Sequence, residues 1–171
     1  MNKGFTLIEL LVSLTIIGIL SGILFLGRTG EEKKLALQRA AYQLSQDLRE
    51  LQEMAIGAGE ANCNGTITHS FGIHFKLSTS LTSYYLFTDC DADQIYDEDD
   101  DKLLREVKLE KNVQLQNLSP SPNILDIVFT PPDPTTFINE EDWGAEGVVT
   151  LSSNSETKTV KINSAGRIEV E

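Results

Sequence analysis

Basic residues are scarce in this chain. Its 171 residues include 14 lysines and arginines against 26 aspartates and glutamates, which gives a formal net charge of −12 at pH 7. A nucleic-acid-binding surface normally needs clustered lysine and arginine, and attraction to anionic lipid needs them as well. The charge balance therefore argues against both kinds of partner. The length suits one soluble domain together with an anchor.

Histidine, the commonest general base of catalytic sites, is also scarce. There are two histidines, His69 and His74, and neither has a cysteine, aspartate or glutamate near it in its predicted strand. We expect neither to bind a metal; His69 should be half-buried and His74 should lie on the polar face. There is no legible Ser/His/Asp or Cys/His arrangement and no glycine-rich phosphate-binding loop. Paired acids occur mainly in one crowded segment that does not suit glycosidase chemistry. We therefore predict that the protein is not an enzyme.

Cysteine is limited to Cys63 and Cys90. An even number of cysteines in an exported domain permits one disulfide. The two positions come opposite each other if the intervening strands form a hairpin that turns near residues 76–79. We predict a Cys63–Cys90 disulfide that stabilises the fold by about 2–4 kcal/mol. The alternative is two buried free thiols.

One long apolar run is present near the start of the chain. Residues 5–27 contain Glu9 as their only charged side chain. A helix of about 20 apolar residues, rising about 1.5 Å per residue, can cross the core of a bilayer. An acid inside such a segment is costly without a partner. The run therefore predicts a transmembrane helix in which Glu9 has a function.

The local sequence Gly-Phe-Thr-Leu-Ile-Glu at residues 4–9 resembles the processing site of type IV prepilins, a family that includes the pseudopilins of type II secretion. The resemblance implies that a prepilin peptidase cleaves after Gly4 and methylates the amine of Phe5. It also implies that Glu9 neutralises the N-terminal ammonium of a neighbouring subunit, because opposite charges in a low-dielectric helix bundle are tolerable only as a pair. The alternative is an ordinary signal anchor in which Glu9 has no role.

The next segment has the pattern of an amphipathic helix. Its apolar residues recur at spacings of three and four, and Gly57 and Gly59 are expected to end the helix near Ile56. This pattern predicts one long helix whose first half is apolar on all sides and whose second half packs on a sheet. The residues of the predicted apolar stripe are Leu37, Ala41, Leu44, Leu48, Leu51 and Ala55.

The rest of the chain has strand patterns. Two adjacent runs, residues 103–109 and 113–118, are predicted to form a hairpin that turns at positions 111 and 112. Together with the other runs this predicts an antiparallel meander after a long helix, which is an α+β fold. The other predicted strands are residues 66–76, 81–88, 124–129, 148–151, 157–162 and 167–170. The predicted organisation is a leader at 1–4, a transmembrane or filament-core helix at 5–27, an amphipathic helix at 28–58 and a β-rich head at 59–171.

The segment 89–101 has eight acids and no base. Counted from Asp89, its acids match the ligand spacing of an EF-hand calcium loop, although Gln94 replaces the usual glycine and an aspartate replaces the final glutamate. Oxygen ligands favour Ca²⁺ over zinc. The alternative is a solvated acidic loop without an ion. The predicted Ca²⁺ ligands are Asp89, Asp91, Asp93, the carbonyl of Ile95, Asp97 and Asp100.

Within the family, the sequences of residues 39–56 and 159–170 resemble H-type minor pseudopilins and their minor-pilin relatives; another pilin subclass is the alternative. The resemblance implies a minor structural subunit of a type IV pilus or type II secretion pseudopilus. Its implied partners are other pilins or pseudopilins, the prepilin peptidase and an inner-membrane assembly platform. The precursor would cross the cytoplasmic membrane once with its head exported, before joining a periplasmic or cell-surface filament. The alternative function is a filament-tip binding module for adhesion or DNA uptake.

Overall fold

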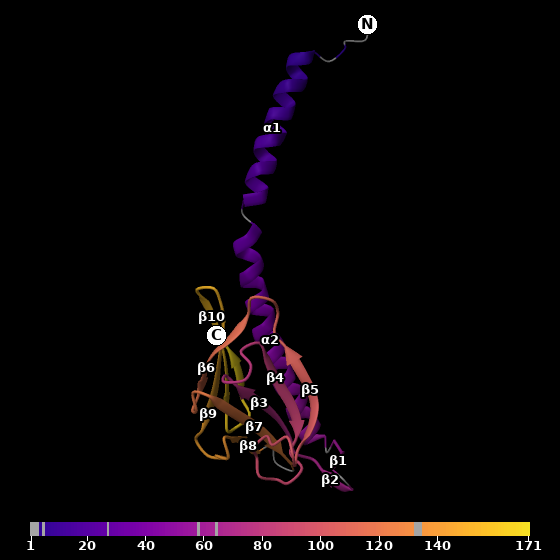
Figure 1. The fold of residues 1–171 in the computed structure, drawn as a ribbon, viewed down its shortest axis with the longest axis vertical. Coiled ribbons are helices and arrows are strands. Elements are labelled where there is room, and N and C mark those ends of the chain that lie inside the picture. Colours follow the sequence, from indigo (N-terminus) through magenta and orange to yellow (C-terminus); the bar gives the residue numbers. More distant parts are fainter. Residues whose placement is uncertain (1–3, 5, 27, 58, 64, 132–134) are drawn as a thin grey trace.

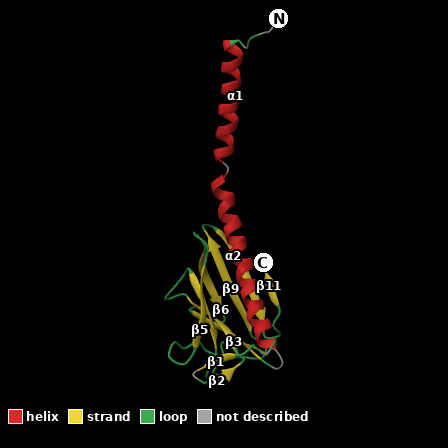
Figure 2. Ribbon diagram, turned by 90° about the vertical axis from the view of Figure 1, so that its right-hand side faces the viewer, coloured by secondary structure: helices red, strands yellow, loops and turns green. Residues whose placement is uncertain are grey.

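The structure is a computed structural model that describes residues 4, 6–26, 28–57, 59–63, 65–131 and 135–171. Two helices, α1 (Leu7–Leu26) and α2 (Arg28–Ile56), follow each other roughly end to end (Figure 1). The first projects away from the head, and the C-terminal part of α2 lies along one side of the strands (Figure 2). Within the described residues, no helix combines the length and hydropathy that a membrane span requires.

The apolar stripe of α2 attaches the helix to the head. All six residues predicted for this stripe are buried, and they belong to the main hydrophobic core. The helix contacts strands of both large sheets, so its apolar face and the inner faces of the sheets form one core. At the end of the helix, the Gly57 and Gly59 amides each donate a hydrogen bond of 2.8 Å to a carbonyl of the last turns. The predicted end near Ile56 is confirmed.

The head contains three antiparallel sheets. A short hairpin pairs β1 (Ala61–Cys63) with β2 (Thr66–Thr68). The second sheet has the order β5-β4-β3-β7-β8, and the third has the order β11-β10-β9-β6. The strands of the second sheet are β3 (Phe71–Lys76), β4 (Ser83–Thr88), β5 (Lys102–Lys108), β7 (Ile124–Thr130) and β8 (Thr135–Ile138). The strands of the third are β6 (Gln114–Ser119), β9 (Glu146–Ser153), β10 (Glu156–Asn163) and β11 (Ile168–Val170). The α+β fold class is confirmed.

Two details of the predicted strand arrangement are wrong. Strands β5 and β6 do not form a hairpin; β5 is an edge of the five-stranded sheet, whereas β6 is an edge of the four-stranded sheet. The sheets are also not a simple meander, because β3 pairs with β7 and β6 pairs with β9. The alternation of apolar residues predicts which face of a strand is buried, but it does not identify the partner strand.

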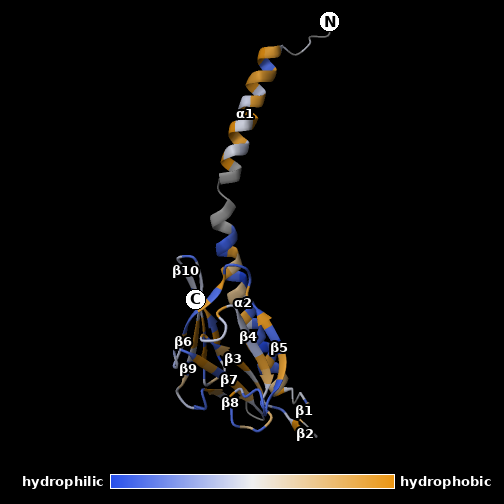
Figure 3. Ribbon diagram, in the orientation of Figure 1, coloured by the Kyte–Doolittle hydropathy of each residue, from blue (hydrophilic) through white to orange (hydrophobic). Residues whose placement is uncertain are grey.

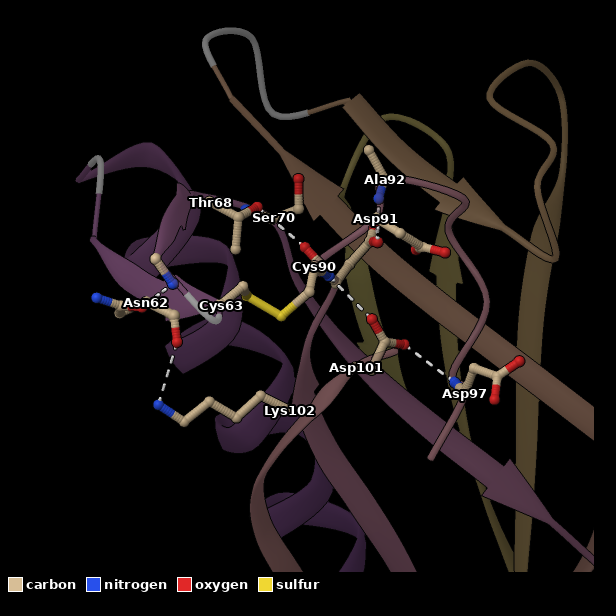
Figure 4. The surroundings of a disulfide bond; sticks show 12 residues. Asn62, Cys63, Thr68, Ser70, Cys90, Asp91, Ala92, Asp97, Asp101 and Lys102 are labelled. Carbon is tan, nitrogen blue, oxygen red and sulfur yellow. Dashed lines mark hydrogen bonds between the residues drawn. A yellow bond between two sulfur atoms is a disulfide. The ribbon is translucent and has the colours of Figure 1, made fainter. Parts of the chain in front are cut away.

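The predicted strand at 66–76 is divided in two. Residues His69 and Ser70 separate β2, which pairs with β1, from β3, which pairs with β4 and β7. As a result, Cys63 lies in the short β1–β2 hairpin and not in the five-stranded sheet. The first sheet therefore lies next to the segment that joins β4 to β5, as Figure 4 shows.

Candidate functional site

Thr6 and Glu9 form a reciprocal set of hydrogen bonds at the start of α1. The Thr6 amide and hydroxyl donate to Oε2 of Glu9 at 3.0 and 2.8 Å, and the Glu9 amide donates to the Thr6 hydroxyl oxygen at 3.4 Å. This is a capping box, which satisfies amide groups that have no partner within the helix. It holds the carboxylate of Glu9 at the helix N-terminus, where the helix dipole favours negative charge.

The other residues of the predicted processing site are only partly described. Gly4 is exposed and precedes the helix. Phe5, the predicted new N-terminus and methylation site, lies outside the described residues. Cleavage after Gly4, methylation of Phe5 and the intersubunit role of Glu9 therefore remain predictions.

The surface of α1 is apolar and exposed. Figure 3 shows hydrophobic residues along much of its length. Large apolar side chains are exposed at successive positions of the helix, so the exposure is not confined to one face. For example, Leu7, Ile17 and Ile23 are 83, 59 and 64% exposed. Contiguous apolar surface of this extent marks a region that contacts a membrane or another protein.

A second candidate site lies where β4 ends and β5 begins. Oxygen atoms of Asp89, Asp91 and Asp101 all lie within 4.8 Å of one another, and this group could hold a metal ion. Asp89 follows β4 directly, and Asp101 directly precedes β5. The two ends of the acidic segment are thus brought together by the pairing of β4 with β5.

Asp89 is the buried member of this group, with 1% of its surface exposed. Its Oδ1 accepts a 2.8 Å hydrogen bond from the Ala92 amide, whereas its Oδ2 is buried without a hydrogen-bond partner. Burial raises the pKa of Asp89 to about 6; the Ala92 amide opposes this shift, and the negative charges of neighbouring aspartates, including Asp101 and Asp91, add to it. Burying a polar atom without a hydrogen-bond partner is unfavourable, and such atoms in proteins are usually satisfied by water or an ion.

Asp101 closes the segment. Its Oδ1 accepts a 2.9 Å hydrogen bond from the Cys90 amide, and its Oδ2 accepts a 3.0 Å hydrogen bond from the Asp97 amide (Figure 4). Burial raises the pKa of Asp101, and the hydrogen bonds from Cys90 and Asp97 oppose that shift. This carboxylate therefore connects the start, the middle and the end of the acidic segment.

The structure brings together part of the predicted ligand set. Asp89 and Asp91 belong to the carboxylate group, and Asp101, which the spacing did not select, belongs to it as well. Three predicted carboxylate ligands are not among its members: Asp93, Asp97 and Asp100. The predicted carbonyl ligand of Ile95 is a backbone group and stays a prediction. The EF-hand spacing predicts Asp100 as the last ligand. The pairing of β4 with β5 instead places the next residue, Asp101, beside Asp89.

The predicted disulfide between Cys63 and Cys90 is present, with the Cα atoms 5.6 Å apart. It joins β1 to the residue between Asp89 and Asp91 (Figure 4). The Thr68 hydroxyl connects the same parts by donating to the Asp89 carbonyl at 2.9 Å. Beside them, Nζ of Lys102, the first residue of β5, donates to the Asn62 carbonyl at 3.4 Å. The first sheet and the acidic segment are thus connected covalently and by a hydrogen bond.

His74 differs from its predicted position on the polar face. It is buried, and its Nδ1 lies 2.6 Å from Oδ1 of Asp126 on β7. Tyr96, from the middle of the acidic segment, packs against His74, with the centroids of the two rings 4.9 Å apart. No nearby sequence position signals this pair, because Asp126 is brought to His74 by the pairing of β3 with β7. His69 is half-buried, as predicted, with Nδ1 2.9 Å from the Gly59 carbonyl.

Comparison with known families identifies the start of the chain. A family model described as the prokaryotic N-terminal methylation motif matches residues 1–25. This motif supports a type IV pilin or pseudopilin precursor that a prepilin peptidase processes. The family is structural rather than enzymatic. No curated protein matches the chain, and no solved structure matches it.

Proposed function

We propose, from the type IV pilin-like family that the methylation motif supports, that this chain is a minor structural subunit of a type IV pilus or type II secretion pseudopilus. As a precursor, it is anchored in the cytoplasmic membrane by its first helix with the head exported. The peptidase cleaves it after Gly4 and methylates Phe5. An assembly platform in the inner membrane then adds the subunit to a periplasmic or cell-surface filament.

The observation that carries this proposal is the exposed apolar surface of α1. Covering apolar surface is favourable by about 25 cal/mol per Å². The head covers one side of α2, including its apolar stripe, and α1 projects beyond the head (Figure 1). Lipid covers α1 in the precursor, and the first helices of neighbouring subunits cover it in the filament. Glu9 then pairs with the N-terminal ammonium of a neighbour.

We also propose that Ca²⁺ is a structural ion of the head. The carboxylate group between β4 and β5 offers oxygen ligands, which suit Ca²⁺ better than softer metals. The ion would offset part of the negative charge of a segment with eight acids and no base, and so reduce the repulsion between its carboxylates. Mg²⁺ should substitute poorly because it requires a smaller, nearly octahedral site.

The charges of the head do not favour the alternative of a tip module for DNA uptake. Lys161 lies 2.7 Å from Glu171, and Arg167 lies 2.5 Å from Glu169. Bases that are paired with acids in this way do not form the positive surface that DNA binding uses.

Mass spectrometry of the N-terminus tests the filament proposal. The protein should be produced in a host with a prepilin peptidase, and its mature form should begin with methylated Phe5. Gly4→Val should leave the precursor uncleaved, because a branched side chain replaces the glycine at the cleavage site. Gly18→Val is the matched control; a side chain there meets nothing within 4 Å, so cleavage should proceed. A mature chain that begins near residue 27 would instead indicate a conventional signal peptide and contradict the proposal.

A further inference from the structure

We propose that Asp89, Asp91 and Asp101 are the carboxylate ligands of the Ca²⁺ site and that the Cys63–Cys90 disulfide holds these ligands in the binding geometry. This inference rests on the assignment of Ca²⁺ above and extends it to a ligand set and a dependence on the disulfide.

The first argument is the buried oxygen of Asp89. Its Oδ2 has no hydrogen-bond partner, and the side chain is 1% exposed. The carboxylate that carries this oxygen belongs to the same group as those of Asp91 and Asp101. A bound cation gives this oxygen a partner and compensates for its burial.

The second argument is the separation of the ligand atoms. Two oxygens bound to one Ca²⁺ at about 2.3–2.6 Å lie at most about 5 Å apart. The three carboxylate oxygens lie within 4.8 Å of one another, which meets this limit. The remaining positions around the ion can be filled by water or by further oxygens of the segment, since Ca²⁺ accepts a flexible set of ligands.

The third argument is charge. In the part of the chain that the structure describes, no lysine or arginine forms an ion pair with Asp89, Asp91 or Asp101. The nearest base in sequence, Lys102, instead donates to the Asn62 carbonyl. Three close carboxylates without a basic partner repel one another, and a divalent cation removes this repulsion.

The disulfide enters through Cys90, which contacts every part of the site. It stands between two ligands, Asp89 and Asp91, and its amide donates to the third, Asp101, at 2.9 Å. Its sulfur is bonded to Cys63 on β1, so the position of Cys90 is fixed from outside the acidic segment (Figure 4). Because coupling between two equilibria is reciprocal, the disulfide should strengthen Ca²⁺ binding and Ca²⁺ should protect the disulfide.

Isothermal titration of the full-length protein in detergent, stripped with chelator and titrated with CaCl₂, tests the ligand set. The wild type should bind Ca²⁺, and Asp101→Asn should weaken binding by about tenfold or more, as loss of a group that binds or orients a ligand does. Asp100→Asn is the matched control; it makes the same change in charge one residue away and should have a much smaller effect. A larger effect from Asp100→Asn would overturn this ligand set and favour the EF-hand spacing. If the wild type binds no Ca²⁺, the assignment of the ion is itself wrong. The filament proposal would be unaffected, because mass spectrometry of the N-terminus tests it separately.

The dependence on the disulfide is tested with the Cys63→Ser, Cys90→Ser double variant. Its Ca²⁺ affinity should fall by about tenfold or more. Because this variant could fail to fold, a second measurement uses the wild type: a phosphine reductant is added with and without Ca²⁺, and the appearance of free thiols is followed by alkylation and mass spectrometry. Ca²⁺ should slow the reduction. Equal rates of reduction would overturn the proposed coupling, even if Ca²⁺ binds.

Discussion

At the scale of single residues, a buried polar contact joins α2 to the five-stranded sheet. The Tyr84 hydroxyl donates to Oδ2 of Asp47 at 2.5 Å, and Nη2 of Arg105 donates to Oδ1 of Asp47 at 2.8 Å. Both Tyr84 and Asp47 are buried, and burial raises the pKa of each. Arg105 and Tyr84 therefore provide the hydrogen bonds that a buried carboxylate requires.

Tyr84→Phe should lower the free energy of unfolding by about 1–3 kcal/mol, because it leaves a buried carboxylate oxygen without its partner. Chemical denaturation of the full-length protein in detergent measures this loss. Tyr42→Phe, which removes a hydroxyl from a half-exposed side chain on α2, is the control and should be nearly neutral. Equal stability of the two variants would show that the Tyr84 hydroxyl contributes nothing to the fold.

At the scale of the elements, α2 is the part on which the two large sheets converge. Its stripe packs on β3 and β7 of one sheet and on β9, β10 and β11 of the other. The side chains of Leu44 and Leu51 are completely buried, and they belong to the same core as Phe71 and Ile127. Loss of this stripe would therefore weaken both sheets together.

Leu51→Ala should cost about 2–5 kcal/mol of unfolding free energy, because it removes buried methyl groups and leaves a cavity. Leu35→Ala is the matched control on the same helix, where the side chain is 51% exposed. Denaturation curves of the two variants should differ by most of this amount. Similar midpoints would mean that α2 is not held to the head by its apolar stripe.

At the scale of the whole molecule, the two ends have different surfaces. The hydrophobic core lies in the head and the part of α2 that packs on it, whereas α1 projects from the head with its apolar side chains exposed (Figures 1 and 3). Because removing apolar surface from water is favourable, contact with lipid or with another protein should stabilise the projecting helix. The capping box at Thr6 and Glu9 places one negative charge at the far end of that helix.

Glu9→Ala should be cleaved normally but should enter filaments poorly, because a neighbour's N-terminal ammonium would then lie in an apolar bundle without a partner. Immunoblots of sheared filaments and of membranes separate these two steps. Glu32→Ala changes an exposed acid on α2 and serves as the control. Wild-type amounts of the Glu9→Ala variant in the filament fraction would contradict the role that we assign to Glu9.

Local patterns in the sequence determined the parts of this protein that depend on neighbouring residues. The uninterrupted apolar run around Glu9 predicted the first helical segment, because its length suits a helix that crosses a bilayer. The stripe that includes Leu44 and Leu51 predicted the second, because side chains three and four positions apart share a helix face. With two cysteines, only one intramolecular pairing was possible, and the structure contains it. The N-terminal resemblance also needed no tertiary structure, since a peptidase recognises a short contiguous sequence.

Only the tertiary structure decided which distant residues meet. Strands β5 and β6 are neighbours in sequence and were predicted to pair, yet β5 pairs with β4 and β6 pairs with β9, in two different sheets. The same pairing of β4 with β5 brings Asp101 rather than Asp100 beside Asp89, and the pairing of β3 with β7 brings Asp126 to His74. A strand's own pattern specifies its buried face, whereas its partner and register depend on how all the apolar faces are covered at once.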